Sequence, residues 1–216
     1  MIRLFDIFLS LVALLCLAPL FILVALVLRL SGEGEIFYKQ KRVGFKNNQF
    51  ELLKFATMLK DSPNIGTKTI TLKNDPRVLP IGKFLRMTKV NELPQLINIL
   101  RGDMSIIGPR PLTLETFRMY SLEVQSEIVK CRPGLSGVGS IVFRDEQSLL
   151  NRGEEPIKFY REKIAPCKGE LEVWFVKNRG MILYFTLILC TLWSLFNKNT
   201  NLLWRVYPNL PKFEQK

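Results

Sequence analysis

The sequence contains no histidine, and only four of its 216 residues are cysteines: Cys16, Cys131, Cys167 and Cys190. No two of these cysteines have the C-x-x-C spacing of a metal or redox site, so reduced thiols are the expected state. The missing histidine excludes a Ser-His-Asp or Cys-His nucleophile and a His-ligated zinc site. Any proton transfer must therefore use carboxylates, Lys, Tyr or Cys, or a substrate that arrives already ionised.

Acidic residues are also few, because 19 Asp and Glu stand against 31 Lys and Arg, which gives a net charge of +12. The chain is nevertheless 48% hydrophobic, with a mean hydropathy of +0.13. A basic and apolar chain indicates an anionic membrane surface as partner, with nucleic acid as the competing interpretation. Nucleic acid is the weaker one, since no helix-turn-helix, zinc module or aromatic RNA-binding strand signature is present.

The N-terminus carries a long apolar segment, in which residues 7–28 contain no charged side chain. Its 22 residues would form a helix of roughly 33 Å, enough to cross a hydrocarbon core of about 30 Å. The run is too long for a signal peptide and no small-x-small site follows it, so it is expected to stay attached. Pro19 lies near its middle and predicts a kink. Either the helix spans with a bend, or it turns at Pro19 and returns; the positive-inside tendency favours the return, and a simple one-pass anchor is the plainer alternative.

A second apolar run covers residues 181–196 and, at 16 residues, is short for spanning, which favours an interfacial or buried helix. The basic, aromatic tail after it suits either a headgroup region or solvent. We therefore expect a membrane helix over 1–30 broken near Pro19, one compact domain over 31–200, and a basic tail over 201–216.

Between the apolar runs the pattern predicts an α+β domain, without low complexity or an obvious linker. Short strands are expected at 35–38, 49–55 and 141–143, and a loop at 61–69. The clearest helix begins at Asn91 as N-cap and ends at Gly102, because residues 93, 96, 97 and 100 form one apolar face. A second helix is expected over 112–129, entered through Pro111, and others over 156–164 and 170–176.

Basic residues near turns suggest phosphate binding. Arg110 lies in Gly-Pro-Arg-Pro, where two prolines fix the backbone and hold the guanidinium in place for bidentate phosphate contact. Sparse acids lie near the same points, and one or two of them could hold a Mg²⁺ that bridges to substrate phosphates. The plainer interpretation is a basic domain that only binds anionic lipid. The residue types alone do not decide between this interpretation and specific phosphate chemistry.

Two longer motifs make the sequence recognisable. Residues 89–98 read KVNELPQLIN and residues 102–111 read GDMSIIGPRP, supported by RLFD at 3–6, QKRVG at 40–44, NDPR at 74–77, GKFLR at 82–86 and RPGLSG at 132–137. In order and over roughly residues 1–195, this resembles the bacterial sugar transferase family, the monotopic polyprenyl-phosphate sugar-1-phosphate transferases.

The resemblance implies transfer of a sugar-1-phosphate from a UDP-sugar to polyprenyl (undecaprenyl) phosphate, which gives polyprenyl-diphosphate-sugar and UMP. This would be the first membrane step of a bacterial glycan pathway, such as exopolysaccharide or lipopolysaccharide biosynthesis. It also implies a re-entrant N-terminal helix, attachment to the inner membrane with the catalytic domain on the cytoplasmic face, and Mg²⁺ as cofactor. The sugar, the pathway and a homodimeric state stay open.

The implied site residues can be carried over one by one. The resemblance assigns catalysis to the dyad at Asn91 and Glu92, with Glu92 also as the metal ligand. It assigns substrate-phosphate binding to six residues: Lys54, Arg77, Arg86, Arg110, Arg144 and Asp145.

The chain departs from the family pattern at Asn91, where the family has an Asp nucleophile. An amide cannot replace that carboxylate directly. Glu92 or a nearby acid such as Asp103 could attack instead, the ionised lipid phosphate could attack directly, or the protein could be a catalytically inactive membrane scaffold. The intact Lys54, Arg86 and Arg110 favour an active enzyme. Transfer between groups that arrive ionised also needs no histidine.

Overall fold

The computed structural model describes residues 1–31, 33–62, 75–150, 156–197 and 201–212. The strands are β1 (Phe37–Val43), β2 (Gln49–Phe55), β3 (Ser105–Ile107) and β4 (Gly134–Ser136). The helices are α1 (Ile2–Leu30), α2 (Pro80–Met87), α3 (Gln95–Arg101), α4 (Leu114–Phe117), α5 (Leu122–Ile128), α6 (Val138–Val142), α7 (Glu146–Leu150), α8 (Pro156–Phe159), α9 (Ala165–Asn178), α10 (Met181–Phe196) and α11 (Asn201–Val206). Short 3₁₀ turns lie at Phe45–Asn47 and Val90–Glu92, and a π-helical turn at Tyr160–Ile164. The predicted α+β class is confirmed.

Two small sheets hold the strands. β1 and β2 form an antiparallel hairpin in which Phe37 pairs with Phe55 and Val43 with Gln49. The predicted strand at 49–55 is confirmed, and the first strand begins two residues later than expected. β3 and β4 pair in parallel. This pair was not predicted, because strands of three residues are too short to show a period.

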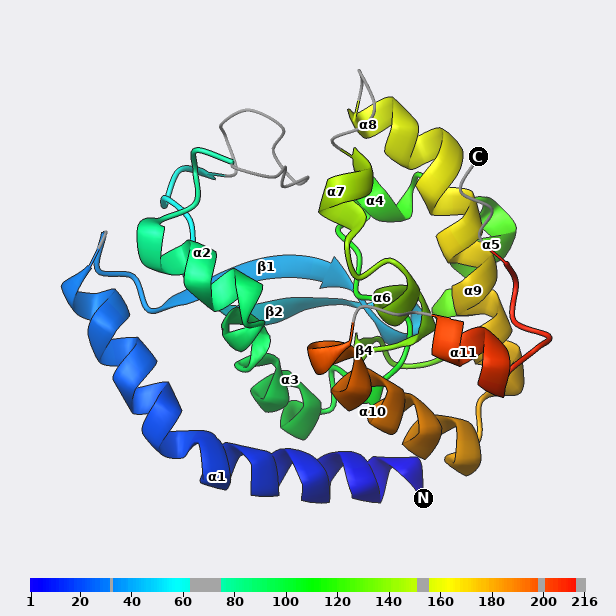
Figure 1. Ribbon diagram of the computed structural model, residues 1–216, viewed down its shortest axis with the longest axis horizontal. Helices are drawn as coiled ribbons and strands as arrows, with labels where there is room; N and C mark the ends of the chain where they lie inside the picture. Colours follow the sequence, from blue (N-terminus) through cyan, green and yellow to red (C-terminus); the bar gives the residue numbers. More distant parts are fainter. Residues whose placement is uncertain (32, 63–74, 151–155, 198–200, 213–216) are drawn as a thin grey trace.

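Helix α1 is continuous from Ile2 to Leu30 and contains Pro19. Figure 1 shows that it bends near its middle, so that its two halves run in different directions. Proline has no N–H to donate to the carbonyl four residues earlier, and its ring crowds that carbonyl, which bends a helix without ending it. The predicted kink is thus present.

Both halves of α1 contact the same domain. At its first turn, Arg3 donates to the carbonyl oxygens of Ile99 (2.6 Å) and Leu100 (3.1 Å), at the C-terminal end of α3. In its last turns, Val24 and Leu28 are buried in one cluster with Phe55 and Leu85. The helix therefore lies along the domain instead of leading away from it.

The helix predicted from Asn91 is wrong at its start. Residues 90–92 form a 3₁₀ turn, and α3 begins only at Gln95, after Pro94 as N-cap; Asn91 makes no capping hydrogen bond. The N–H groups of Glu92 and Leu93 bind the carbonyl oxygens of Lys89 and Val90, three residues earlier, so the chain closes a 3₁₀ turn before the α-helix begins. The predicted end is confirmed, since Gly102 is the C-cap with φ +96°.

Two further predictions are corrected. Residues 112–129 form two helices, α4 and α5, because Thr113 and Ser121 each accept a backbone N–H and begin a new helix. The strand expected at 141–143 is the end of α6. The loop expected at 61–69 lies mostly outside the described residues, while the helices expected at 156–164 and 170–176 are confirmed.

The main core forms where α9 and α10 pack against the β3–β4 edge and the segments around it. Leu203 and Leu210, in and after α11, are buried in this same core. Trp174 of α9 meets Tyr207 edge-on, with 5.5 Å between ring centroids. The domain boundaries expected from the sequence remain predictions.

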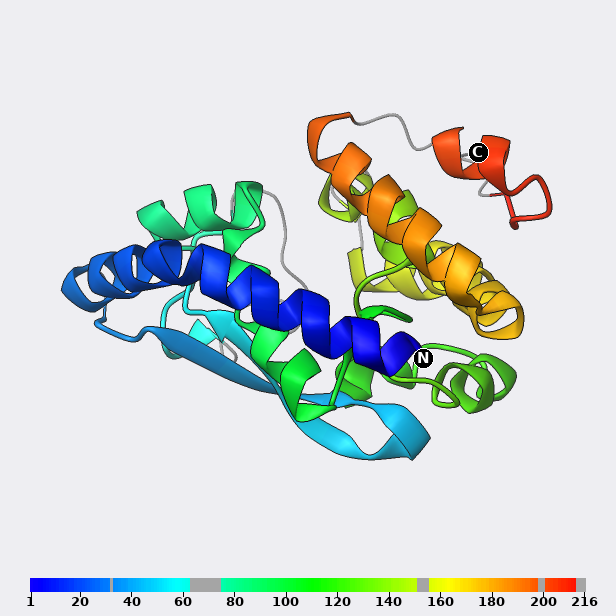
Figure 2. The same cartoon turned by 90° about the horizontal axis from the view of Figure 1, so that it is seen from below.

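One face of the molecule is strongly apolar. Figure 2 shows α1 and α10 side by side on this face, and Phe5 of α1 packs edge-on against Phe185 of α10. Both helices expose large apolar side chains there: Leu4, Phe8, Leu11, Leu15, Ile22, Leu23 and Leu26 from α1, and Ile182, Leu189, Leu192 and Trp193 from α10. We call this surface the apolar face. Of the described helices, only α1 is long and apolar enough to cross a membrane.

Candidate active site

A cavity of about 1320 Å³ opens between the β1–β2 hairpin, α2, the 3₁₀ turn at 90–92, the Gly-Pro-Arg-Pro loop, α6, α7 and α10. Its lining includes seven of the eight site residues expected from the sequence: Lys54, Arg86, Asn91, Glu92, Arg110, Arg144 and Asp145. These residues come from parts of the chain up to 91 positions apart, from Lys54 to Asp145, and the fold brings them to one place.

Lys54 is carried by β2, whose position is set by a buried amide. Asn98 of α3 is fully buried and accepts a hydrogen bond from the backbone N–H of Leu53 (2.9 Å). Its Nδ2 donates to the carbonyl oxygen of Glu51 (2.7 Å). The side chain of Asn98 thus fixes β2 against α3 and holds Lys54 near the turn that carries Glu92.

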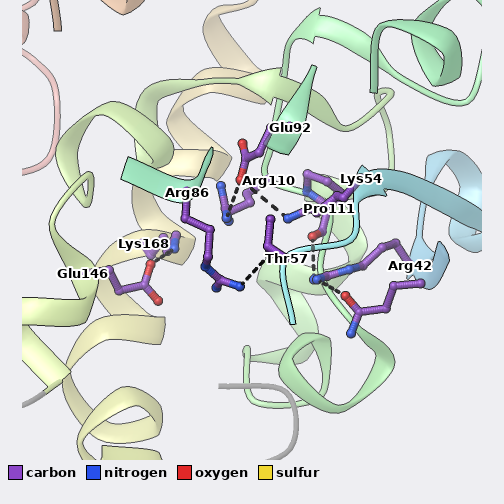
Figure 3. A network of polar contacts seen from close by, with 10 residues as sticks. Arg42, Lys54, Thr57, Arg86, Glu92, Arg110, Pro111, Glu146 and Lys168 are labelled. Carbon is purple, nitrogen blue, oxygen red and sulfur yellow. Dashed lines mark hydrogen bonds and ion pairs between the residues drawn. The ribbon is translucent and has the colours of Figure 1, made fainter. Parts of the chain in front are cut away.

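Glu92 is the acidic centre of the cavity (Figure 3). Its Oε1 lies 3.5 Å from Lys54 Nζ and 3.8 Å from Arg110 Nη2. Burial acts to raise the pKa of the Glu92 carboxyl, but Lys54, Arg110 and Lys89 outweigh it and lower the pKa to about 2. Glu92 is therefore a carboxylate throughout the physiological pH range.

The positive charge around Glu92 exceeds what one carboxylate neutralises. Burial lowers the pKa of Lys54 to about 8, and Arg42, Arg110 and Arg86 act in the same direction against the opposing effect of Glu92. Burial, with Arg110, likewise lowers the pKa of Arg42 to about 10. Arg110 differs, because burial acts to lower its pKa but Glu92, Glu146 and Glu172 outweigh burial and raise it. A site with several buried cations favours an anion with several negative oxygens.

The Gly-Pro-Arg-Pro loop is held in place from two sides. A Cβ atom on Gly108 would lie 2.4 Å from the carbonyl oxygen of Arg132, so only glycine permits this close approach. On the other side, Arg42 Nη1 donates to the carbonyl oxygen of Pro111 (3.1 Å). The loop presents Arg110 beside Glu92, as the two prolines in the sequence suggested.

Arg86 and the neutral side chain of Asn91 also line the cavity near Glu92. Arg86 Nη1 lies 3.4 Å from Thr57 Oγ1, at the limit of a hydrogen bond. Asn91 is buried, and its Oδ1 has no hydrogen-bond partner. A buried amide oxygen without a partner is costly, and it provides an acceptor or ligand atom at the edge of this cavity.

Arg77 is placed differently from the other seven residues. It is buried, and its Nε and Nη2 bind the two carboxylate oxygens of Asp75 at 2.9 and 2.6 Å, while Nη1 binds the carbonyl oxygen of Ser62 (3.0 Å). It is not among the described residues that line the cavity. Its observed contacts support the wall that contains Asp75, and its expected contact with phosphate stays a prediction.

Comparison with known proteins identifies the family of this chain. The family model described as bacterial sugar transferase matches residues 1–198. The chain belongs to the bacterial sugar transferase family.

Relatives of this sugar transferase come from several bacteria. The chain is 36% identical over 164 residues to the exopolysaccharide production protein ExoY of Sinorhizobium fredii. This alignment covers 69% of this chain and 72% of the relative. The chain is 35% identical over 197 residues to the exopolysaccharide production protein PSS of Rhizobium leguminosarum bv. phaseoli, 89% of this chain and 93% of the relative. Over 173 residues it is 36% identical to the UDP-glucose:undecaprenyl-phosphate glucose-1-phosphate transferase of Escherichia coli, 79% of this chain but 36% of that longer protein.

Further charged residues, not predicted from the sequence, lie in or beside the sugar transferase site. Lys89 lines the cavity and acts on Glu92. Lys168 of α9 is almost fully buried, and its Nζ lies 2.5 Å from Glu146 Oε2 (Figure 3). Glu172, one turn further along α9, is buried as well. Lys168 and Glu172 lie four residues apart on one side of α9, but the sequence does not distinguish them from the exposed Glu170 and Lys177 of the same helix.

The site offers few protein ligands for a metal ion, but enough for Mg²⁺. No three His, Cys, Asp or Glu side chains of the described residues form a metal-binding group. Mg²⁺ usually binds through one or two protein oxygens together with substrate phosphates and water. The Glu92 carboxylate and the unpartnered Oδ1 of Asn91 fit that donor set.

Proposed function

We propose that this sugar transferase moves a sugar-1-phosphate from a UDP-sugar to polyprenyl phosphate. An oxygen nucleophile attacks the β-phosphorus of the UDP-sugar, the bond from that phosphorus to the bridging oxygen breaks, and UMP leaves with the electron pair. The final product is a polyprenyl-diphosphate-sugar. The relatives named as UDP-glucose:undecaprenyl-phosphate glucose-1-phosphate transferases support this choice of donor and acceptor.

The observation that carries the proposal is the excess of positive charge around Glu92. Lys54, Arg110 and Arg86 lie near the Glu92 carboxylate, and burial together with the neighbouring cations lowers the pKa of Lys54 in spite of this carboxylate. A diphosphate supplies the missing negative charge, and cations fixed in a partly buried site stabilise charge that develops on phosphoryl oxygens and on the leaving UMP. Neither the attack nor the departure requires a proton, which suits a chain without histidine.

The apolar face supports a lipid acceptor. Ile188, Leu192 and Leu195 of α10 line the same cavity as Lys54 and Arg110, and Leu192 is half exposed. A polyprenyl phosphate could therefore place its headgroup among the cations while its chain follows α10 into lipid. We place the protein at the bacterial inner membrane with the cavity on the cytoplasmic side, where UDP-sugars are made.

We propose Mg²⁺ as the cofactor. When bound, it would neutralise charge on the diphosphate and act as a Lewis acid. Glu92 and Asn91 would hold it, while Lys54, Arg86 and Arg110 bind and orient the phosphate oxygens.

Because Asn91 is an amide, another group must act as the nucleophile. The Glu92 carboxylate is ionised and can attack the β-phosphorus, giving an acyl phosphate from which the lipid phosphate then takes the phosphosugar. Alternatively, the lipid phosphate attacks directly. Asn91 is also the observation that favours a second candidate function, a membrane scaffold that binds UDP-sugar or lipid without turnover.

The deciding experiment is UMP release. The full-length protein in detergent, given polyprenyl phosphate, Mg²⁺ and a panel of UDP-sugars, is expected to release UMP with at least one of them. Release should require the lipid phosphate if that group attacks directly. Absence of release across the whole panel, with UDP binding retained, would establish the scaffold instead.

Two substitutions in the 3₁₀ turn separate the mechanisms. Glu92→Gln removes the carboxylate that pairs with Lys54 and Arg110 and is expected to lower kcat by roughly 10²-fold or more. Asn91→Asp restores a second carboxylate, and a phosphosugar adduct on residue 91 seen by mass spectrometry would show that the native chain is an attenuated form of the family scheme. An adduct on Glu92 in the native protein would identify it as the nucleophile. Glu51→Gln and Asn48→Asp, both at exposed positions of the hairpin, are the matched controls.

A further inference from the structure

Helix α9 places a buried carboxyl group behind the Gly-Pro-Arg-Pro loop. Glu172 is only 3% exposed although it is a carboxylate, and its neighbours in the chain are the apolar residues Leu171 and Val173. Its Oε1 accepts the backbone N–H of Arg110 at 3.2 Å. Glu172 does not line the cavity, so it reaches the reaction site only through this loop.

The approach of this carboxylate depends on a glycine in α6. A Cβ atom on Gly139 would lie 2.4 Å from Glu172 Oε1 and 3.0 Å from its Cδ. Only glycine leaves room there for the carboxyl group to reach the N–H of Arg110. The second oxygen, Oε2, is buried without a hydrogen-bond partner. The carboxyl group is thus packed for one contact, the one to Arg110.

The charges around Glu172 come from each element packed against it. Lys168 lies one turn earlier on α9 and is paired with Glu146 of α7, while Arg110 lies in the loop. Tyr120, before α5, and Cys131 are the titratable groups on the remaining side; burial raises the pKa of both, and Glu172 acts in the same direction. Burial raises the pKa of Glu172 itself to about 7, against the opposing effects of the Arg110 N–H, Lys168 and the Arg110 guanidinium.

We propose that Glu172 is a positioning residue for the transfer reaction, which fixes the backbone of Arg110 and so aims its guanidinium at the substrate phosphates. An ionised carboxylate accepts a stronger hydrogen bond than a neutral carboxyl group. The loop is therefore held most firmly when Glu172 is charged. Deprotonation of Glu172 near neutral pH should raise both phosphate binding and turnover through Arg110.

The inference rests on the proposed function and is tested with Glu172→Gln, which keeps size and shape but cannot ionise. At pH 6, where Glu172 is largely protonated, variant and native protein should differ little in UMP release. At pH 8 the native protein should be faster by about fivefold to tenfold, the difference between a charged and a neutral hydrogen bond. Glu170→Gln is the matched control, since Glu170 is exposed on the same helix and should match the native protein at both pH values.

Affinity for UDP, measured at the same two pH values, gives a readout that does not need turnover. It should show the same widening gap between native protein and Glu172→Gln. A ratio that stays constant from pH 6 to 8 in both measurements would reduce Glu172 to a structural residue and overturn the inference. Failure of the proposed function would look different, because the native protein itself would release no UMP.

Discussion

At Lys54 and Glu92, burial and charge act on the two partners in different ways. Burial disfavours the charged form of both groups, but the surrounding cations reverse its effect on the pKa of Glu92 and add to it at Lys54. The ion pair between them is long, at 3.5 Å. The pair is therefore incomplete without an anion, and Lys54 is the residue at which binding of a diphosphate should be seen.

Binding of UDP at pH 8 should take up a proton. With a pKa of about 8, Lys54 is about half charged in the free protein, and a bound diphosphate favours its charged form, so uptake of up to about half a proton per site is expected. Affinity should fall as pH rises through 8. Calorimetry in two buffers of different ionisation enthalpy measures the uptake.

Lys54→Arg is the control for this proton uptake, because arginine stays charged at pH 8. It should bind UDP with no uptake near that pH. Tight UDP binding by the native protein without any proton uptake would contradict the assignment of Lys54 to the diphosphate.

At the scale of elements, one carboxylate joins three parts of the fold. Asp6 of α1 is almost fully buried, and its Oδ1 accepts from Ser105 Oγ (3.0 Å), the backbone N–H of Ile106 (2.9 Å) and Tyr184 Oη (2.8 Å). These donors belong to β3 and α10. The first turn of the apolar helix is thus a built-in part of the domain.

Asp6→Ala should destabilise the fold, because it leaves buried donors on β3 and α10 without an acceptor. The expected cost is about 2–4 kcal/mol, or a fall in melting temperature of roughly 5–15 °C for a chain of this size. Tyr184→Phe removes only one donor and should cost about 1 kcal/mol. Thermal unfolding in detergent measures both, and a melting temperature of Asp6→Ala equal to that of Tyr184→Phe would disprove the three-way role.

For the whole molecule, the placement of α1 restricts how the protein meets a membrane. Its first turn binds α3 and β3, and its last turns pack against β2 and α2. A helix attached to one domain at both ends cannot place those ends on opposite sides of a bilayer without leaving the domain. The apolar face of α1 and α10 would then rest in one leaflet.

Both ends of α1 should therefore be accessible from the same side. Single cysteines at Ile2 and at the exposed Glu33, in a background without the four native cysteines, should react with a membrane-impermeant maleimide in inverted inner-membrane vesicles. Neither should react from outside intact spheroplasts. Labelling of position 2 from outside and of position 33 only in inverted vesicles would show that the helix spans the membrane.

Much of the fold could be predicted from the sequence where local chemistry decides. The hairpin follows from its strand residues and turn, the end of α3 from Gly102, and the kink of α1 from Pro19. Predictions failed where local hydrogen bonds overrode the pattern: a 3₁₀ turn precedes α3, and Thr113 and Ser121 divide one expected helix into two. The β3–β4 pair is a long-range contact of three-residue strands, which no local pattern reveals.

The sequence by itself determined the family, and seven of its eight predicted site residues line one cavity, because motif residues and fixed turns keep their chemistry wherever the chain folds. Only the tertiary structure decided what each charge meets. It paired Arg77 with Asp75, placed Glu92 among several buried cations, and placed Glu172 behind Arg110. Burial and charge set these pKa values and contacts, and both depend on neighbours that lie far away along the chain.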